Sequence, residues 1–148
     1  MDELRELRAR IRVLEEIEAI KQLKARYWRC VDQKLWNEWA DCFVEDAKMD
    51  IQPMGIIQGK RQIVQAISNG IGTAISTHQG HSPEIEITGD TTAKGKWALY
   101  DHIFDERSKT VSEGFGLYED EYVKENGQWK IKTTRITHHY VDRSKKEG

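Results

Sequence analysis

Apolar residues in the first third of the chain follow the spacing of a helix. They recur at three- and four-residue steps, and glutamate, lysine and arginine fill most positions between them. No glycine or proline occurs before Pro53. We therefore expect one long helix whose single apolar stripe is formed by Leu4, Leu7, Ile11, Leu14, Ile17, Ile20, Leu23, Tyr27 and Val31. Residues 1–15 carry so much charge that we expect them to protrude from the domain or to contact a neighbouring subunit.

Two shorter helices and the first strands are predicted between residues 35 and 71. Leucine, tryptophan and phenylalanine at helical spacing indicate a second helix over 35–43, and alternation begins after Asp46. Proline and glycine at 53–55 predict a turn before a short strand at 56–57. Gly59 then precedes a third helix, from Lys60 to about Ile71.

From there to the end, the pattern predicts strands. One follows Pro83, and longer ones are expected at 92–104, 113–123 and 128–140, with Asn126-Gly127 as a hairpin turn and 141–148 as a flexible tail. This order is that of an α+β fold, in which a curved antiparallel sheet packs against about three helices from the N-terminal half of the chain. Such a sheet would enclose a tapering apolar pocket.

Composition narrows the functional classes. A chain of 148 residues fits one domain, 1–148, and its net charge of −2 gives no reason to expect a nucleic-acid partner. No apolar run approaches the roughly 20 residues of a membrane helix, and the charged N-terminus does not resemble a secretory signal, so we expect no membrane partner and a cytoplasmic location. Cys30 and Cys42 lie in apolar surroundings, which favours buried free thiols over a disulfide.

Three segments, 25–32, 76–83 and 97–102, place polar groups where apolar ones are expected. In the third, Asp101 continues the apolar face of Trp97 and Leu99. Buried carboxylates and imidazoles are costly unless paired, so such placements indicate either partners or function.

Each of these polar residues also has a purely structural interpretation. Tyr27 could be an ordinary core tyrosine, and Asp32 could cap a helix. His78, like His81, could bond to the backbone at a strand entrance, and Asp101 could pair with Arg135. On an ideal helix the five-residue spacing also sets Tyr27 and Asp32 about 140° apart.

Taken together, these segments resemble a known family. Residues 17–32, 78–85 and 127–131 are similar to SnoaL-like lyases of the nuclear-transport-factor-2-like superfamily, most of all to bile-acid 7α-dehydratases and more distantly to scytalone dehydratases and hexachlorocyclohexane dehydrochlorinases. The resemblance runs from about residue 17 to residue 131. It implies a cone-shaped fold.

The resemblance also implies a catalytic site that needs no cofactor and no metal. His78 would take a proton from a C–H beside a carbonyl, and Asp32 would orient that imidazole. Tyr27 would contact the substrate oxygen, and Asp101 would supply a further carboxylate. Neutral imidazole can accept a proton near pH 7, which fits this chemistry. The chain shows neither a glycine-rich phosphate loop nor the spacing of a zinc site.

One departure from the family bears on the substrate. Bile-acid dehydratases carry an arginine nine residues after the hairpin tryptophan, whereas counting from Trp129 this chain has His138 there, with Arg135 three residues earlier. We therefore expect a small apolar cyclic substrate, steroid-like or aromatic, rather than a bile-acid thioester. The residues expected to bind it are Met49, Met54, Trp97, Phe115, Arg135 and His138.

The leading hypothesis is a dehydratase acting on a hydroxylated cyclic ketone. An isomerase or a polyketide-cyclase-like enzyme could use the same residues, because each reaction begins with an enolate. Two alternatives belong to other functional classes: a non-catalytic binding module and the small accessory subunit of a ring-hydroxylating oxygenase. We expect a homo-oligomer, a trimer or a dimer, built on the exposed face of the sheet.

Overall fold

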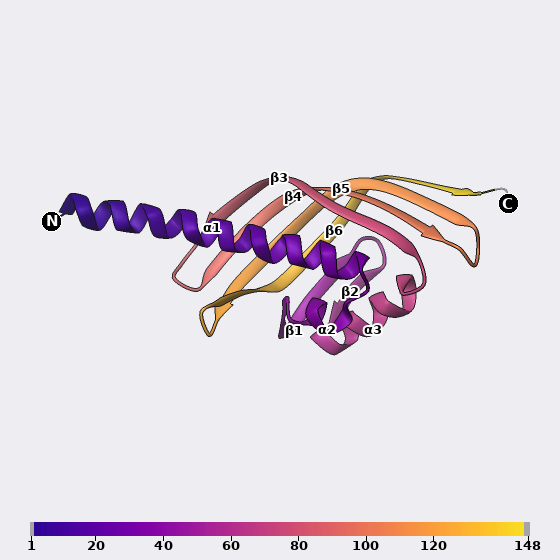
Figure 1. Cartoon of the computed structure of the whole chain (residues 1–148), viewed down its shortest axis with the longest axis horizontal. Helices are drawn as coiled ribbons and strands as arrows, with labels where there is room; N and C mark the ends of the chain where they lie inside the picture. Colours follow the sequence, from indigo (N-terminus) through magenta and orange to yellow (C-terminus); the bar gives the residue numbers. More distant parts are fainter. Residues whose placement is uncertain (1, 147–148) are drawn as a thin grey trace.

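Within residues 2–146, three helices and six strands form an α+β fold in which all three helices precede the four longest strands (Figure 1). The structure is a computed structural model that describes residues 2–146. Its elements are, in order, α1 (Asp2–Asp32), α2 (Trp36–Ala40), β1 (Phe43–Ile51), β2 (Gly55–Gln58), α3 (Lys60–Ile71), β3 (Ile75–Ile87), β4 (Thr92–Asp105), β5 (Thr110–Glu125) and β6 (Gln128–Lys145). The predicted fold class is confirmed, and α3 has the predicted bounds.

The six strands form one curved sheet in the order β2-β1-β6-β5-β4-β3. All neighbours are antiparallel except β1 and β6, which run parallel, so the sheet is mixed and not purely antiparallel as predicted. A parallel pair needs a long crossover, and α3 with β2 to β5 supplies it. Helix α1 crosses one face of the sheet, and α2 and α3 gather beside β1 and β2 (Figure 1). No helix among residues 2–146 is long and apolar enough to span a membrane.

Helix α1 carries two apolar stripes and not the single one predicted. Residues Ile20, Leu23, Tyr27 and Val31 are buried against the sheet, whereas the leucines and the isoleucine before residue 15 are exposed. The reason lies in the steps between Ile11 and Leu23, which are all of three residues. Each such step falls about 60° short of a full turn, so the stripe moves around the helix.

The ends of several elements differ from the prediction, and β3 begins at Ile75 and not after Pro83. Residues 141–145, expected in a flexible tail, continue β6 and pair with residues 110–114 of β5, and Glu147 and Gly148 lie outside the described residues. Helix α2 ends at Ala40, and Phe43 already belongs to β1, because Ile131 N–H donates to the carbonyl of Cys42 and ties the chain to β6. The predicted hairpin turn is present: Asn126 and Gly127 have φ of 51° and 77°, as a type I′ turn requires.

Candidate active site

The end of α1 brings a carboxylate to the start of β3. Asp32 Oδ1 lies 2.7 Å from His78 Nδ1, and Asp32 Oδ2 accepts the backbone N–H of His78 at 2.8 Å. The hydroxyl of Ser76 donates to Asp32 Oδ1 at 3.0 Å, and Lys34 Nζ donates to that hydroxyl at 2.8 Å. A carboxylate on Nδ1 favours the tautomer that carries its proton there, which leaves Nε2 free to accept one. We call this contact the first dyad.

A second histidine–carboxylate pair lies beside the first. His138 Nε2 on β6 is 2.8 Å from Asp101 Oδ2 on β4, and both side chains are largely buried. Asp101 is also the direct cross-strand partner of His78 in the pairing of β3 with β4. The two dyads therefore occupy neighbouring positions on the face of the sheet that α1 covers.

Gly114 on β5 makes room for the second dyad. A side chain at Gly114 would place its Cβ 2.7 Å from His138 Cδ2 and 3.1 Å from Asp101 Oδ1. His138 lies opposite Gly116 in the regular pairing of β5 with β6, which shifts just beyond that pair, between Phe115 and Gly116. The imidazole can thus cross β5 to reach a carboxylate on β4.

Aromatic side chains form the apolar core next to the dyads. Trp28 packs against Trp97 and Tyr118 with ring centroids 5.1 Å and 5.6 Å away, and its indole lies so close to Gly80 that a Cβ there would be 2.0 Å from it. The indole N–H of Trp28 is buried and has no acceptor within residues 2–146. Burial raises the pKa of Tyr27 well above its ordinary value, so this phenol keeps its proton and can only donate it in a hydrogen bond.

A buried ion pair beneath these rings was missed by the sequence analysis. Lys24 Nζ lies 3.0 Å from Asp120 Oδ2, and both side chains are fully buried. Thr134 donates to the other carboxylate oxygen at 2.6 Å, and Tyr122 donates to Oδ2 at 2.7 Å. The signal was available, because Asp120 interrupts an alternating apolar face between two tyrosines just as Asp101 does beside Leu99.

Several residues expected to bind substrate lie elsewhere. Phe115 is 45% exposed on the far face of the sheet, because its neighbours on β5 point inward, and it stacks on Tyr140. Met54 is 80% exposed in the turn after β1. Arg135 also points to the far face and pairs with Asp50 at 3.8 Å, so it does not meet Asp101. Of the other residues expected to bind substrate, His138 belongs to the second dyad, and Trp97 and Met49 are buried in the core.

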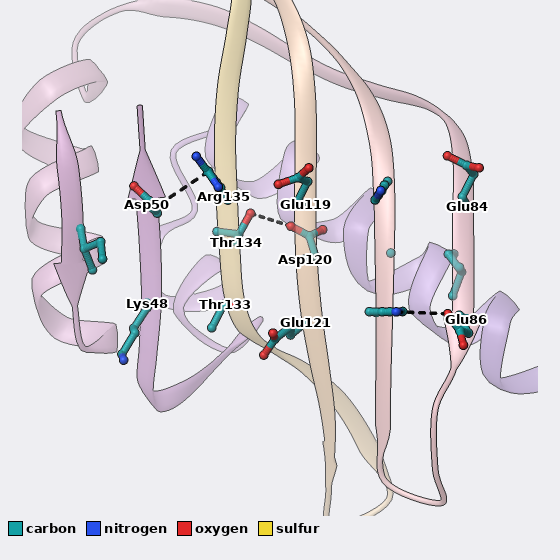
Figure 2. Close-up of a pocket in the computed structure, with 15 residues that line it drawn as sticks. Lys48, Asp50, Glu84, Glu86, Glu119, Asp120, Glu121, Thr133, Thr134 and Arg135 are labelled. Carbon is teal, nitrogen blue, oxygen red and sulfur yellow. Dashed lines mark hydrogen bonds and ion pairs between the residues drawn. The ribbon is translucent and has the colours of Figure 1, made fainter. Parts of the chain in front are cut away.

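The far face of the sheet holds a hollow of about 730 Å³ with a different character (Figure 2). Charged side chains of alternating sign line it, and two of its pairs, Arg135 with Asp50 and Lys94 with Glu86, are joined across strands. No histidine lines this hollow. It therefore lacks the proton-transfer groups that the two dyads provide.

Both thiols are free and buried, as the sequence predicts. Burial raises the pKa of Cys30 and of Cys42, so neither is a ready nucleophile. Within residues 2–146, no group of three or more histidine, cysteine, aspartate or glutamate side chains is arranged to hold a metal ion.

Comparison with known proteins gives a family and a fold. Residues 12–135 match the SnoaL-like domain. A proposed scytalone dehydratase of Novosphingobium aromaticivorans is 24% identical, with a TM-score of 0.81 over 87% of each chain. A hexachlorocyclohexane dehydrochlorinase of Novosphingobium barchaimii is 17% identical, with a TM-score of 0.79 over 88% of this chain and 91% of that one. ActVI-ORFA of Streptomyces coelicolor is 14% identical, with a TM-score of 0.70 over 84% of this chain and 98% of that one.

Proposed function

The chain belongs to the SnoaL-like domain family, and on that premise we propose that it is a cofactor-independent lyase, a dehydratase that removes water from a hydroxylated cyclic ketone. The observation that carries the proposal is the contact between Asp32 and His78, in which both carboxylate oxygens hold the histidine at its ring and its backbone. The similar structures named for a dehydratase and a dehydrochlorinase favour the same reaction class.

In this mechanism, His78 Nε2 removes a proton from the carbon beside the carbonyl. Asp32 stabilises the imidazolium that forms, and the electron pair of the broken C–H bond moves into an enolate. Phenol and indole donors in an apolar site stabilise such an oxyanion more than water does, and Tyr27 and Trp28 are the candidates for this role.

Loss of hydroxide completes the elimination. The C–O bond breaks as the enolate collapses, and the leaving oxygen takes a proton from His138 when that imidazole is protonated beside Asp101. The products are an enone and water. The proton now on His78 passes to solvent, and His138 takes one up from solvent. Both histidines thus regain their initial protonation states after each turnover.

The substrate class rests on the surroundings of the dyads. Trp97, Leu99 and Trp28 are apolar, and no arginine among residues 2–146 forms an ion pair with either dyad. We therefore infer a bulky apolar ring system, steroid-like or aromatic, without an acidic tail. Assembly as a homo-oligomer and a cytoplasmic location remain predictions.

The test is a screen for water loss. Wild type and His78→Ala are incubated with hydroxy-steroids, bile-acid intermediates and hydroxytetralones, and products are followed by mass spectrometry. We expect the wild type alone to dehydrate one class, with a rate loss of about 10²–10⁴ in the variant. His81→Ala is the matched control, because this histidine is exposed on the same strand three residues later.

Three outcomes would contradict the proposal. Unchanged turnover in His78→Ala would remove this histidine as the base. Tight binding of a ring compound without conversion, unaffected by Asp32→Asn, would instead identify a binding module. Conversion to a product of unchanged mass would assign the same dyads to an isomerase.

A further inference from the structure

The first half of α1 protrudes beyond the sheet (Figure 1). All described residues before Glu16 are exposed. Five of them are large and apolar, and four of these five share one side of the helix: Leu4 is 52% exposed, Leu7 47%, Ile11 54% and Leu14 66%. We call these four residues the seam.

The seam has the spacing of a coiled coil. Its steps of three, four and three residues place Leu4 and Ile11 at a positions of a heptad and Leu7 and Leu14 at d positions. The next a and d positions are Glu18 and Lys21, so the apolar pattern ends where α1 reaches the sheet.

The seam faces away from the rest of the molecule. At 100° per residue, the mean direction of the seam is about 175° from that of Ile20, Leu23, Tyr27 and Val31, which pack on the sheet. A helix from a partner chain can therefore lie along the seam without contacting the sheet of the chain to which the seam belongs. In a parallel pair, each domain would lie on the outer side of its own helix.

Charges beside the seam select the partner and its direction. The flanking g and e positions are Glu3, Arg8, Arg10 and Glu15, and all four are exposed. When two copies run parallel, Glu3 meets Arg8 of the other chain and Arg10 meets Glu15, so each contact joins opposite charges. When they run antiparallel, Arg8 meets Arg8 and Arg10 meets Arg10, which is repulsive.

We propose that the seam binds a second copy of this chain as a short parallel coiled coil. Two heptads alone would be marginal in water, because an isolated helix of this length has a large cost of nucleation. Here α1 is already held as a helix by its C-terminal half on the sheet, so pairing orders little additional backbone. An isoleucine at a and leucines at d are typical of two-stranded coils.

The molar mass in solution tests whether the seam holds two chains together. Light scattering after size exclusion is compared for wild type and for Leu7→Glu combined with Leu14→Glu. We expect the variant to have at most half the mass of the wild type, with an unchanged circular dichroism spectrum and melting temperature. Ala9→Glu combined with Val13→Glu adds the same charge on the opposite side of the helix and should keep the wild-type mass. Equal masses for wild type and the seam variant, or an equal loss in the control, would overturn the proposal.

Disulfide cross-linking tests whether the two α1 helices run parallel. Leu14→Cys chains should form a disulfide-linked dimer under mild oxidation, because residues 14 are opposite one another only in a parallel pair. The native thiols are buried and give little background. A disulfide that forms only when Leu14→Cys chains are mixed with Leu4→Cys chains would show an antiparallel pair and overturn the assigned direction.

Discussion

Asp120→Asn should be among the most destabilising conservative changes in this chain. The substitution keeps the shape of the side chain, but it leaves the ammonium of Lys24 fully buried without its counter-charge, which now lies 3.0 Å away. Removing one partner of a buried pair typically costs about 3–5 kcal/mol of unfolding free energy. The three aromatic rings around Lys24 Nζ, at 4.2–4.9 Å from their centroids, soften this cost but do not remove it.

In Asp120→Asn, Lys24 can lose its proton, and the free energy of that deprotonation is an upper bound on the cost of the unpaired charge. From a reference pKa of about 10.4, deprotonation at pH 7 costs about 4.6 kcal/mol at 1.36 kcal/mol per unit. Burial already lowers the pKa of Lys24, although Asp120 opposes that change. In Asp120→Asn the folded state therefore holds fewer protons than the unfolded state. Its stability should rise toward that of the wild type as the pH increases from 7 to 10.

A double-mutant cycle measures the pair itself. Lys24→Met should cost less than Asp120→Asn, because the remaining carboxylate still accepts hydrogen bonds from Thr134 and Tyr122. The double variant should be at least about 2 kcal/mol more stable than the sum of the single losses predicts. Urea unfolding followed by tryptophan fluorescence, at one fixed protein concentration, gives each free energy. A loss below about 1 kcal/mol in Asp120→Asn, or strict additivity, would refute the reasoning.

Two further changes test other contacts. Glu16 accepts bonds from Lys124, at 2.7 Å, and from Trp129, and the bond from Lys124 holds the pKa of Glu16 below its usual range. Glu16→Gln should therefore lower the free energy of unfolding by about 1 kcal/mol at pH 7. In urea titrations the difference from wild type should vanish as the pH falls below 4.5, because the carboxylate is then protonated. Glu18→Gln is the control that should leave the stability unchanged. Gly80→Ala should cost about 1–3 kcal/mol because its Cβ would overlap the Trp28 indole, whereas Gly70→Ala, which meets open space in α3, should not destabilise; thermal melts compare the two.

The sequence predicted most of the fold because the patterns that define it are local. The bounds of α3 and the hairpin at Asn126-Gly127 follow from a few neighbouring residues, and both are present in the structure. The division of α1 into two stripes could also have been found, since it needs only the count of three-residue steps after Ile11. The parallel neighbour of β1 could not, because it depends on a contact between distant strands.

The candidate site was harder to predict from the sequence than the fold. Periodicity alone placed Tyr27 and Asp32 on different sides of α1, and the pairing of Asp32 with His78 was expected only from the family resemblance. Lys24 was passed over because a lysine in a charged helix looks exposed, although it is four residues after Ile20 and three before Tyr27, both on the buried face.

The partner of Asp101 depended on a feature that no local pattern shows. Trp129 and Ile131 are buried, so regular alternation along β6 would turn Arg135 inward as well. The strand irregularity opposite Glu121 and Tyr122 instead turns His138 inward. This leads to a prediction for Gly114→Ala. Its φ lies outside the left-handed region, so alanine fits the backbone, but the added methyl would displace the His138 ring at 2.7 Å. The 2.8 Å contact with Asp101 should then break.

If His138 protonates the leaving oxygen, Gly114→Ala should lower the rate of water loss at least about tenfold while unfolding close to the wild-type temperature, because general acid catalysis contributes about 10²–10⁴. Imidazole ¹⁵N resonances would show directly whether His138 has left its carboxylate, even before a substrate is known. Gly70→Ala should change neither the rate nor those resonances. A displaced His138 with full activity would remove the second dyad from the mechanism, and the leaving oxygen would then take its proton from water.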